Sequence, residues 1–250
     1  SCPMKRRDFL AASAAATVSS SFLGCRQTDT REGLTIGMEQ LVPRSLDHLV
    51  VGVSNLASGV DWITEVFGVR PVYGGRHPRL GTANYLLSLG PETYVELLGP
   101  DPDSESKTEP LLFGIETLVE PSLVTWAAKG TGLKELVAKA NAQDVPLGQV
   151  RSGERAQPNG EEITWDFTDP VAFPSQGLVP FLIDWGNTKH PGMSSPAVGR
   201  LISLRAEHPD PASVRFMLSV LNLDLQVDQG SEPKLVARIQ TLGGDEVEIF

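Results

Sequence analysis

Residues 46–51 read Leu-Asp-His-Leu-Val-Val, and residues 94–98 read Tyr-Val-Glu-Leu-Leu. Both are short runs in which apolar residues surround ionisable ones, and their β-branched and aromatic residues favour strands. Successive side chains of a strand point to opposite faces, so His48 and Glu96 lie opposite the apolar residues next to them. Each run therefore predicts a strand with one apolar face and an ionisable side chain on the other.

The sequence between the two runs completes a unit of one strand, one helix and three strands. Asn55 is a preferred helix-capping residue, an apolar stripe with helical spacing follows it, and Gly68 suits the end of a helix. Strands are expected at residues 70–73, 84–89 and 93–98, with Gly74-Gly75 and Gly90-Pro91 dividing them. The order of elements is βαβββ.

This order of elements recurs further along the chain. A second unit begins with a strand at Leu123 and has a helix whose apolar stripe starts at Leu133. A third, shorter unit begins at Leu201, and Asp210-Pro211 opens its helix. Recurrence of one supersecondary unit indicates tandem duplication, so we expect an α+β fold of repeated βαβββ modules.

The leading segment, residues 1–25, has the features of an export signal. Its sequence KRRDFL at residues 5–10 precedes an uncharged stretch rich in Ala and Ser. The pair Arg6-Arg7 followed by Phe-Leu resembles the twin-arginine type, which exports folded proteins. Residues 22–25, FLGC, resemble a lipobox that would place a lipid on Cys25. We therefore expect an exported protein, either periplasmic or attached to the membrane as a lipoprotein.

Composition and charge narrow the classes of function. The formal net charge is −10, and the body has no basic cluster interleaved with aromatic residues, so we expect no nucleic-acid partner. Cys2 and Cys25 are the two cysteines, and both precede the patterned body, so a metal site there would need His, Asp or Glu. Residues 26–44 are polar and non-periodic, which is typical of a tether. No apolar run of the body reaches the roughly 18 residues that span a bilayer.

The ordered motifs resemble those of the vicinal oxygen chelate superfamily, which includes glyoxalase I and extradiol dioxygenases. More narrowly, they are similar to a group of bacterial glyoxalase-like proteins in GGRHP at 74–78, GTxN at 81–84 and WG at 185–186 before His190-Pro191. The resemblance covers roughly residues 45–250. It implies two modules over residues 45–190 that form a cupped mixed sheet with helices outside, followed by a third module over residues 191–250.

The resemblance also implies a metal site in the cup, on ligands from the first and last strands of each module. It assigns His48 and Glu96 as ligands in the first module, in agreement with the strand alternation. Imidazole and carboxylate suit Zn²⁺, Mn²⁺, Fe²⁺ or Ni²⁺. The second module departs from the pattern, because Thr125 stands in the position of His48, and the closing strand offers Ile183 or, one residue out of register, Asp184. Half of the usual ligand set is missing.

Further residues are candidates for the pocket. His77 lies in a Gly- and Pro-rich loop, where it is either a solvated turn residue or a third ligand or general acid/base acting beside Glu96. The resemblance adds Asn84, Asp184 and His190 to the expected pocket. Four aromatic residues are interpreted as core rather than as a platform for a ligand: Trp126, Trp165, Phe181 and Trp185.

Three functions remain open from the sequence. The first is a metal-dependent lyase, isomerase or dioxygenase of the glyoxalase type that acts on a small molecule. The second is a metal-free protein that binds or sequesters a small molecule in the same cup, which the missing second-module ligands favour. The third is an interaction module: superfamily modules work in pairs, so a chain with three of them predicts a homodimer.

Overall fold

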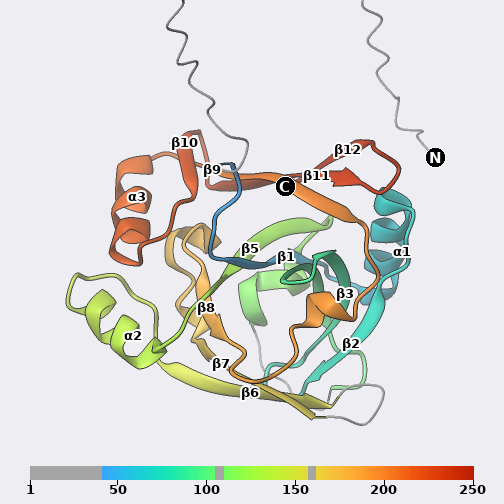
Figure 1. Ribbon diagram of the computed structural model, residues 1–250, viewed down its shortest axis with the longest axis horizontal. Coiled ribbons are helices and arrows are strands. Elements are labelled where there is room, and N and C mark those ends of the chain that lie inside the picture. Colours follow the sequence, from blue (N-terminus) through green and yellow to red (C-terminus); the bar gives the residue numbers. More distant parts are fainter. Residues whose placement is uncertain (1–40, 105–109, 157–161) are drawn as a thin grey trace, which may run out of the picture. The chain divides into compact units, whose positions relative to one another are not determined.

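The computed structural model describes residues 41–104, 110–156 and 162–250 (Figure 1). The predicted export signal at residues 1–25, with Cys25, lies outside the described residues, as does most of the predicted tether. The described part of the chain contains three α-helices and twelve strands in two sheets. None of its helices has the length and apolar character needed to cross a membrane.

The larger sheet has eight strands, which come from two units with the same order of elements. The first unit comprises β1 (Leu46–Gly52), α1 (Leu56–Phe67), β2 (Val72–His77), β3 (Thr82–Gly90) and β4 (Thr93–Pro100). The second comprises β5 (Ser122–Lys129), α2 (Leu133–Asn141), β6 (Val150–Ala156), β7 (Glu162–Thr168) and β8 (Phe181–Asp184). The strand order across the sheet is β2-β3-β4-β1-β5-β8-β7-β6.

The pairing of these strands produces a cup. In each unit the first strand pairs in parallel with the last, and β1 pairs antiparallel with β5 at the centre of the sheet. The two edge strands, β2 and β6, approach each other, so the curved sheet is nearly closed (Figure 1). The prediction of an α+β fold with a cupped mixed sheet is confirmed.

Local sequence sets the bounds of the elements. The Asn55 side chain accepts a hydrogen bond from the backbone N–H of Ser58 at the start of α1, and Gly68 ends that helix in the left-handed region with φ 69°. The expected break at Gly74-Gly75 is wrong, because β2 continues through both residues. The register against β3 shifts there, which indicates a bulge in the strand rather than its end.

The last part of the chain forms a separate four-stranded sheet. Its elements are β9 (Gly199–His208), α3 (Pro211–Val220), β10 (Gln226–Gln229), β11 (Lys234–Thr241) and β12 (Glu246–Ile249). The strand order is β10-β9-β11-β12, and β9 pairs in parallel with β10, the strand directly after the helix. The order of elements is again βαβββ, but the pairing differs from that of the two modules in the cup.

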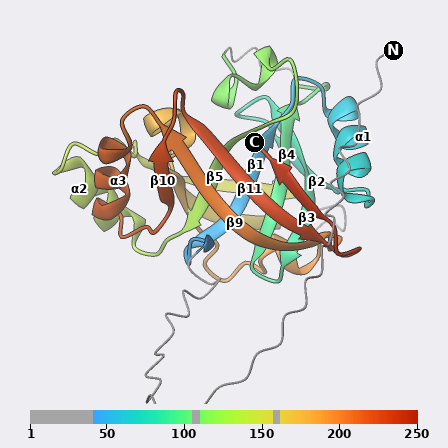
Figure 2. The ribbon, with the colours of Figure 1, turned by 90° about the horizontal axis from the view of Figure 1, so that it is seen from above.

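The small sheet covers the outer face of the cup. Leu204 and Ile239 of this sheet share one buried core with Leu49 of β1 and Trp126 of β5, and Figure 2 shows β9 and β11 lying across β1 and β5. Helix α1 packs its apolar stripe on the same core. The third unit therefore already has a partner within its own chain. This removes the argument for a homodimer from an unpaired module, and the homodimer itself stays a prediction.

Candidate functional site

The concave face of the larger sheet surrounds a cavity of about 580 Å³, its mouth included. Six side chains with polar groups line it: His48, His77, Asn84, Tyr94, Glu96 and Arg155. Apolar and mostly aromatic side chains line the rest of the cavity, among them Phe113, Trp165, Phe167, Phe181, Ile183 and Trp185.

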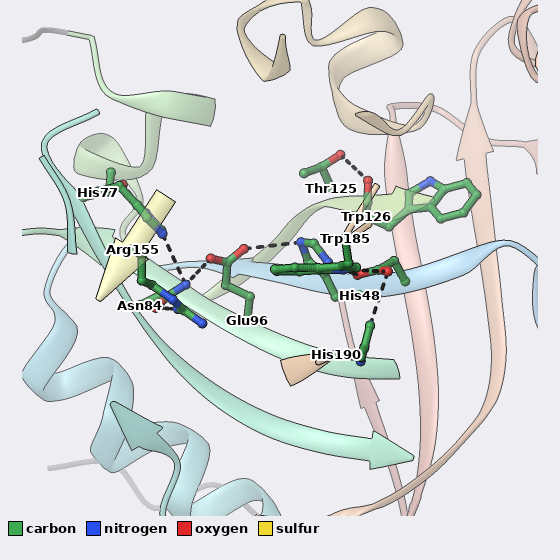
Figure 3. Close-up of polar contacts among 11 residues, drawn as sticks. His48, His77, Asn84, Glu96, Thr125, Trp126, Arg155, Trp185 and His190 are labelled. Carbon is green, nitrogen blue, oxygen red and sulfur yellow. Dashed lines mark hydrogen bonds and ion pairs between the residues drawn. The ribbon is translucent and has the colours of Figure 1, made fainter. Parts of the chain in front are cut away.

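His48 and Glu96 lie together on the inner face, as strand alternation predicts. The parallel pairing of β1 with β4 sets Val50 opposite Glu96, and His48 is two residues from Val50 on the same face. Nε2 of His48 is 3.5 Å from Oε2 of Glu96 (Figure 3). Only 2% of His48 and 8% of Glu96 is exposed. The metal-ligand role of the two residues stays a prediction.

Asp47 belongs to this cluster, although alternation alone places it on the outer face. The pairing of β1 with β5 shifts register between Leu46 and His48, so Asp47 is the extra residue of a bulge. Its fully buried carboxylate lies 2.7 Å from Nδ1 of His48 and accepts a hydrogen bond from the Trp185 indole at 3.1 Å. One feature of the sequence indicates that Asp47 has polar partners: it stands within an apolar run, and a carboxylate is costly to bury without such partners.

The cluster is charged. Burial lowers the pKa of His48, but hydrogen bonds to Asp47 and Glu96 outweigh burial and raise it to about 9. Burial raises the pKa of Glu96, but the hydrogen bond and charge of His48 outweigh it and bring that pKa to about 2. The pKa of Asp47 is likewise held well below its ordinary value, despite burial, by hydrogen bonds to His190 and His48. At neutral pH the site is therefore an imidazolium between two carboxylates.

Asn84 extends the cluster to the far side of the cup. Its Nδ2 donates to Oε1 of Glu96 at 2.6 Å, and its Oδ1 accepts from Nη1 of Arg155 at 2.8 Å (Figure 3). Asn84 is on β3, next to the edge strand β2, and Arg155 is on the other edge strand, β6, so this pair connects the two ends of the sheet. A Cβ atom at Gly74 would come within 2.2 Å of the Asn84 oxygen and 2.6 Å of the Arg155 nitrogen. The glycine is therefore required for the pair to form.

The remaining predicted residues divide between the cavity and its surroundings. His77 lines the cavity, where its Nδ1 is 3.0 Å from the Thr82 hydroxyl, so it is not a solvated turn residue. Asp184 does not line the cavity, because alternation turns its neighbours Ile183 and Trp185 inward, while its own carboxylate accepts from the backbone N–H of Gly186.

His190 was also expected in the pocket, and it does not line the cavity. It caps the 3₁₀ turn Pro191–Met193, and its Nε2 lies 3.3 Å from the carboxylate of Asp47. It therefore contacts the cluster through Asp47 and not through the cavity.

Three of the four aromatic residues interpreted as core are wall residues instead. Trp165, Phe181 and Trp185 line the cavity, whereas Trp126 is fully buried and donates its indole N–H to the backbone carbonyl of Leu178. An aromatic residue suits a core and the wall of a pocket alike, so its residue type does not reveal which of the two it faces. Gly153 makes room for one of them, because a Cβ atom there would lie 2.3 Å from the Trp165 ring.

The donor set does not fit the divalent metal that the resemblance implies. Thr125, in the position of His48, donates its hydroxyl to the backbone carbonyl of Gly177, and the pairing of β5 with β8 places Phe181, rather than Ile183 or Asp184, in the position of Glu96. Among the described residues, no group of three or more His, Cys, Asp or Glu converges on one point. The guanidinium of Arg155, one side chain away from Glu96, adds a positive charge that opposes a cation.

Comparison with known proteins agrees with this fold. A family model described as a glyoxalase-like domain matches residues 46–221, and no curated protein matches the sequence. A hypothetical protein from Staphylococcus aureus has a similar structure, with a TM-score of 0.58 at 14% identity over 81% of this chain and 97% of that one.

Methylmalonyl-CoA epimerases are similar over smaller parts of the structure. The enzyme from Mycobacterium tuberculosis gives a TM-score of 0.37 at 19% identity over 58% of this chain and 90% of its own. A variant of the Streptomyces coelicolor enzyme in complex with 2-nitronate-propionyl-CoA gives 0.38 at 15% identity, over 59% and 98%.

Proposed function

This chain belongs to the glyoxalase-like domain family, and on that premise we propose that its cup binds a small organic molecule directly, without a metal ion. The family and the fold support a role in binding or converting a small molecule. The observation that carries the metal-free form is the hydrogen bonding of the cluster, in which His48 and Asn84 already satisfy Glu96. These groups leave no convergent set of free ligands for a cation.

The second-module wall supports binding of a flat, apolar body. The ring centroids of Trp165 and Trp185 are 5.4 Å apart, and Phe181 also lines the cavity. Aromatic side chains supply large contact areas and favour stacked or edge-to-face contacts with another ring. The polar side chains opposite them give such a ligand a fixed orientation.

One observation favours the second candidate, a metal-dependent lyase, isomerase or dioxygenase. His48 donates its Nδ1–H toward Asp47 while Nε2 faces Glu96, and a carboxylate behind the imidazole is typical of metal-binding histidines. In that function His48 and Glu96 would hold Zn²⁺, Mn²⁺, Fe²⁺ or Ni²⁺, and Glu96 with His77 would be the catalytic residues.

Metal analysis and thermal shift together separate the two candidates. We expect freshly purified protein to contain no stoichiometric divalent ion, and 2-naphthamide, a neutral aromatic probe, to raise the melting temperature equally with and without EDTA. Phe181→Ala should weaken this effect, whereas Phe216→Ala, on the exposed face of α3, should not. A stoichiometric metal that disappears in His48→Ala would establish the metal-dependent function instead.

We also propose that the chain is exported by the twin-arginine route and that Cys25 carries a lipid anchor, since the leading sequence resembles both signals. Changing Arg6 and Arg7 together to Lys should leave folded precursor in the cytoplasm, because lysine lacks the guanidinium fork. Cys25→Ala should still be exported but released from the membrane. Export of the double-Lys variant at the normal rate would contradict the twin-arginine route.

The predicted homodimer is checked by light scattering of the body of the chain without its leading segment.

A further inference from the structure

Arg155 is a buried cation that has no counter-ion within the described part of the chain. Only 7% of its surface is exposed, and it lines the cavity from β6. Among residues 41–104, 110–156 and 162–250, its guanidinium has one hydrogen bond, from Nη1 to the neutral amide of Asn84, and its buried Nε has no partner. No ion pair joins it to a carboxylate among the described residues, although other arginines of this acidic chain have such partners. Burying a charge without a counter-ion costs free energy, unless a bound ligand supplies the opposite charge and the missing hydrogen bonds.

Asn84 is the reason that Glu96 does not neutralise Arg155. The amide lies between them and uses one atom on each, Nδ2 on the carboxylate and Oδ1 on the guanidinium. The second oxygen of Glu96 faces Nε2 of His48. Glu96 is thus engaged on both oxygens, and Arg155 is kept positive and available. A Cβ atom at position 74 would collide with both Asn84 and Arg155, so the observed arrangement of this pair depends on the glycine.

We propose that Arg155 binds the carboxylate of the ligand, so that the cup selects small aromatic acids. A guanidinium presents a planar fork of donors that matches a carboxylate with two parallel hydrogen bonds. Arg155 and Gly153 lie two residues apart on the same face of β6, and Gly153 pairs with Trp165. An acid held by Arg155 therefore has its ring beside the aromatic wall. This inference rests on the proposed function, because it names the class of molecule that the cup binds.

A matched pair of probes tests the charge while it keeps the ring constant. Binding of 2-naphthoate and 2-naphthamide is measured by calorimetry on the same EDTA-treated protein. We expect the wild type to bind the acid about tenfold or more tightly than the amide, as charge-assisted hydrogen bonds imply. The net charge of −10 repels anions in general, so this preference would come from the cavity.

Variants then assign the preference to Arg155. Arg155→Gln should remove it by lowering the affinity for the acid far more than the affinity for the amide, and Arg155→Lys should restore only part of it, because an ammonium cannot form the fork. Arg79→Gln is the matched control: Arg79 is 85% exposed beside Glu154, and its loss should not change the preference. Melting curves of each variant confirm that it is folded.

The outcomes separate this inference from the proposed function. Equal binding of acid and amide by the wild type, or a preference that survives Arg155→Gln in a folded variant, would overturn the carboxylate site and leave the binding function standing. Tighter binding of 2-naphthyl phosphate than of 2-naphthoate would replace the carboxylate with a phosphate. Binding of neither naphthalene probe would contradict the proposed function and this inference with it.

Discussion

The two walls of the cup occupy equivalent strands of the two modules, yet their chemistry is opposite. The first module places His48 and Glu96 on its first and last strands. The second has Thr125 on the equivalent first strand and Phe181 with Ile183 on the last, together with the charged Arg155 on β6. The backbone frame is repeated while the inward side chains are not. Apart from Arg155, one wall therefore orients polar groups, and the other supplies apolar contact area.

The walls also differ in how their buried polar groups are satisfied. On the first wall the partners are charged side chains, which form one connected cluster from Asp47 to Glu96. On the second wall Thr125 is satisfied locally by a backbone carbonyl of the segment before β8. Loss of one member should therefore cost far more on the first wall than on the second.

Asp47→Ala should give the largest effect. It leaves the imidazolium of His48 buried beside only one carboxylate and removes the acceptor for the Trp185 indole. Breaking a buried pair from one side costs about 3–5 kcal/mol of unfolding free energy. Urea denaturation measures this loss. The control is Asp224→Ala, which breaks a pair with the exposed Arg44 and should cost below about 1 kcal/mol. Equal losses in the two variants would contradict the charged cluster.

His48 makes the first wall sensitive to pH. Its pKa is 6.5 in the unfolded chain and about 9 in the fold, so its stabilising contribution is complete below pH 6.5 and is lost as pH rises through 9. The advantage of the EDTA-treated wild type over His48→Gln should shrink across that window by about 2–3 kcal/mol. Urea denaturation at several pH values measures the difference. A constant difference would mean that the imidazole does not titrate there.

One glycine beneath each wall allows a direct comparison. Gly74→Ala collides with the Asn84–Arg155 pair, and Gly153→Ala collides with the ring of Trp165. Each should cost about 1–3 kcal/mol of stability, but Gly74→Ala should mainly reduce acid selectivity and Gly153→Ala should weaken acid and amide alike. Calorimetry with the naphthalene probes distinguishes them. Gly243→Ala, where a Cβ atom has space, is the control.

Thr125→Val should give the smallest effect. The change keeps the shape of the side chain and removes one neutral hydrogen bond to the Gly177 carbonyl. We expect a loss of about 1 kcal/mol in unfolding free energy. Probe binding should stay as in the wild type, because Thr125 is not among the residues that line the cavity. A loss as large as that of Asp47→Ala would show that the second wall also depends on a connected polar cluster.

Local patterns were sufficient for the frame of the molecule and for one part of the site. Asn55 and Gly68 bound the first helix through interactions within a few residues, and the alternation along β1 and β4 brings His48 and Glu96 to one face. Asp47 escaped prediction because a bulge, which depends on the partner strand β5, returns its side chain to the cluster.

Other parts of the site depend on contacts between distant strands. Arg155 lies on β6, whose sequence has no apolar alternation, and it meets Asn84 only because the edge strands of the cup approach each other. The direction of Trp165 could not be read from its own strand, since an aromatic residue suits either the core or a pocket. The order of elements likewise does not specify which strand pairs in parallel with β9, and in the structure that strand is β10.

The antiparallel pairing of β1 with β5 bears on how such a cup changes over generations. It joins the two modules mainly through backbone hydrogen bonds, which nearly any side chain permits. Inward residues of one copy can thus be exchanged while the seam between the copies is kept. In a duplicated fold of this kind, the inward residues of one module can change while the polar residues of the other are kept. Related proteins can then bind new ligands with the same fold.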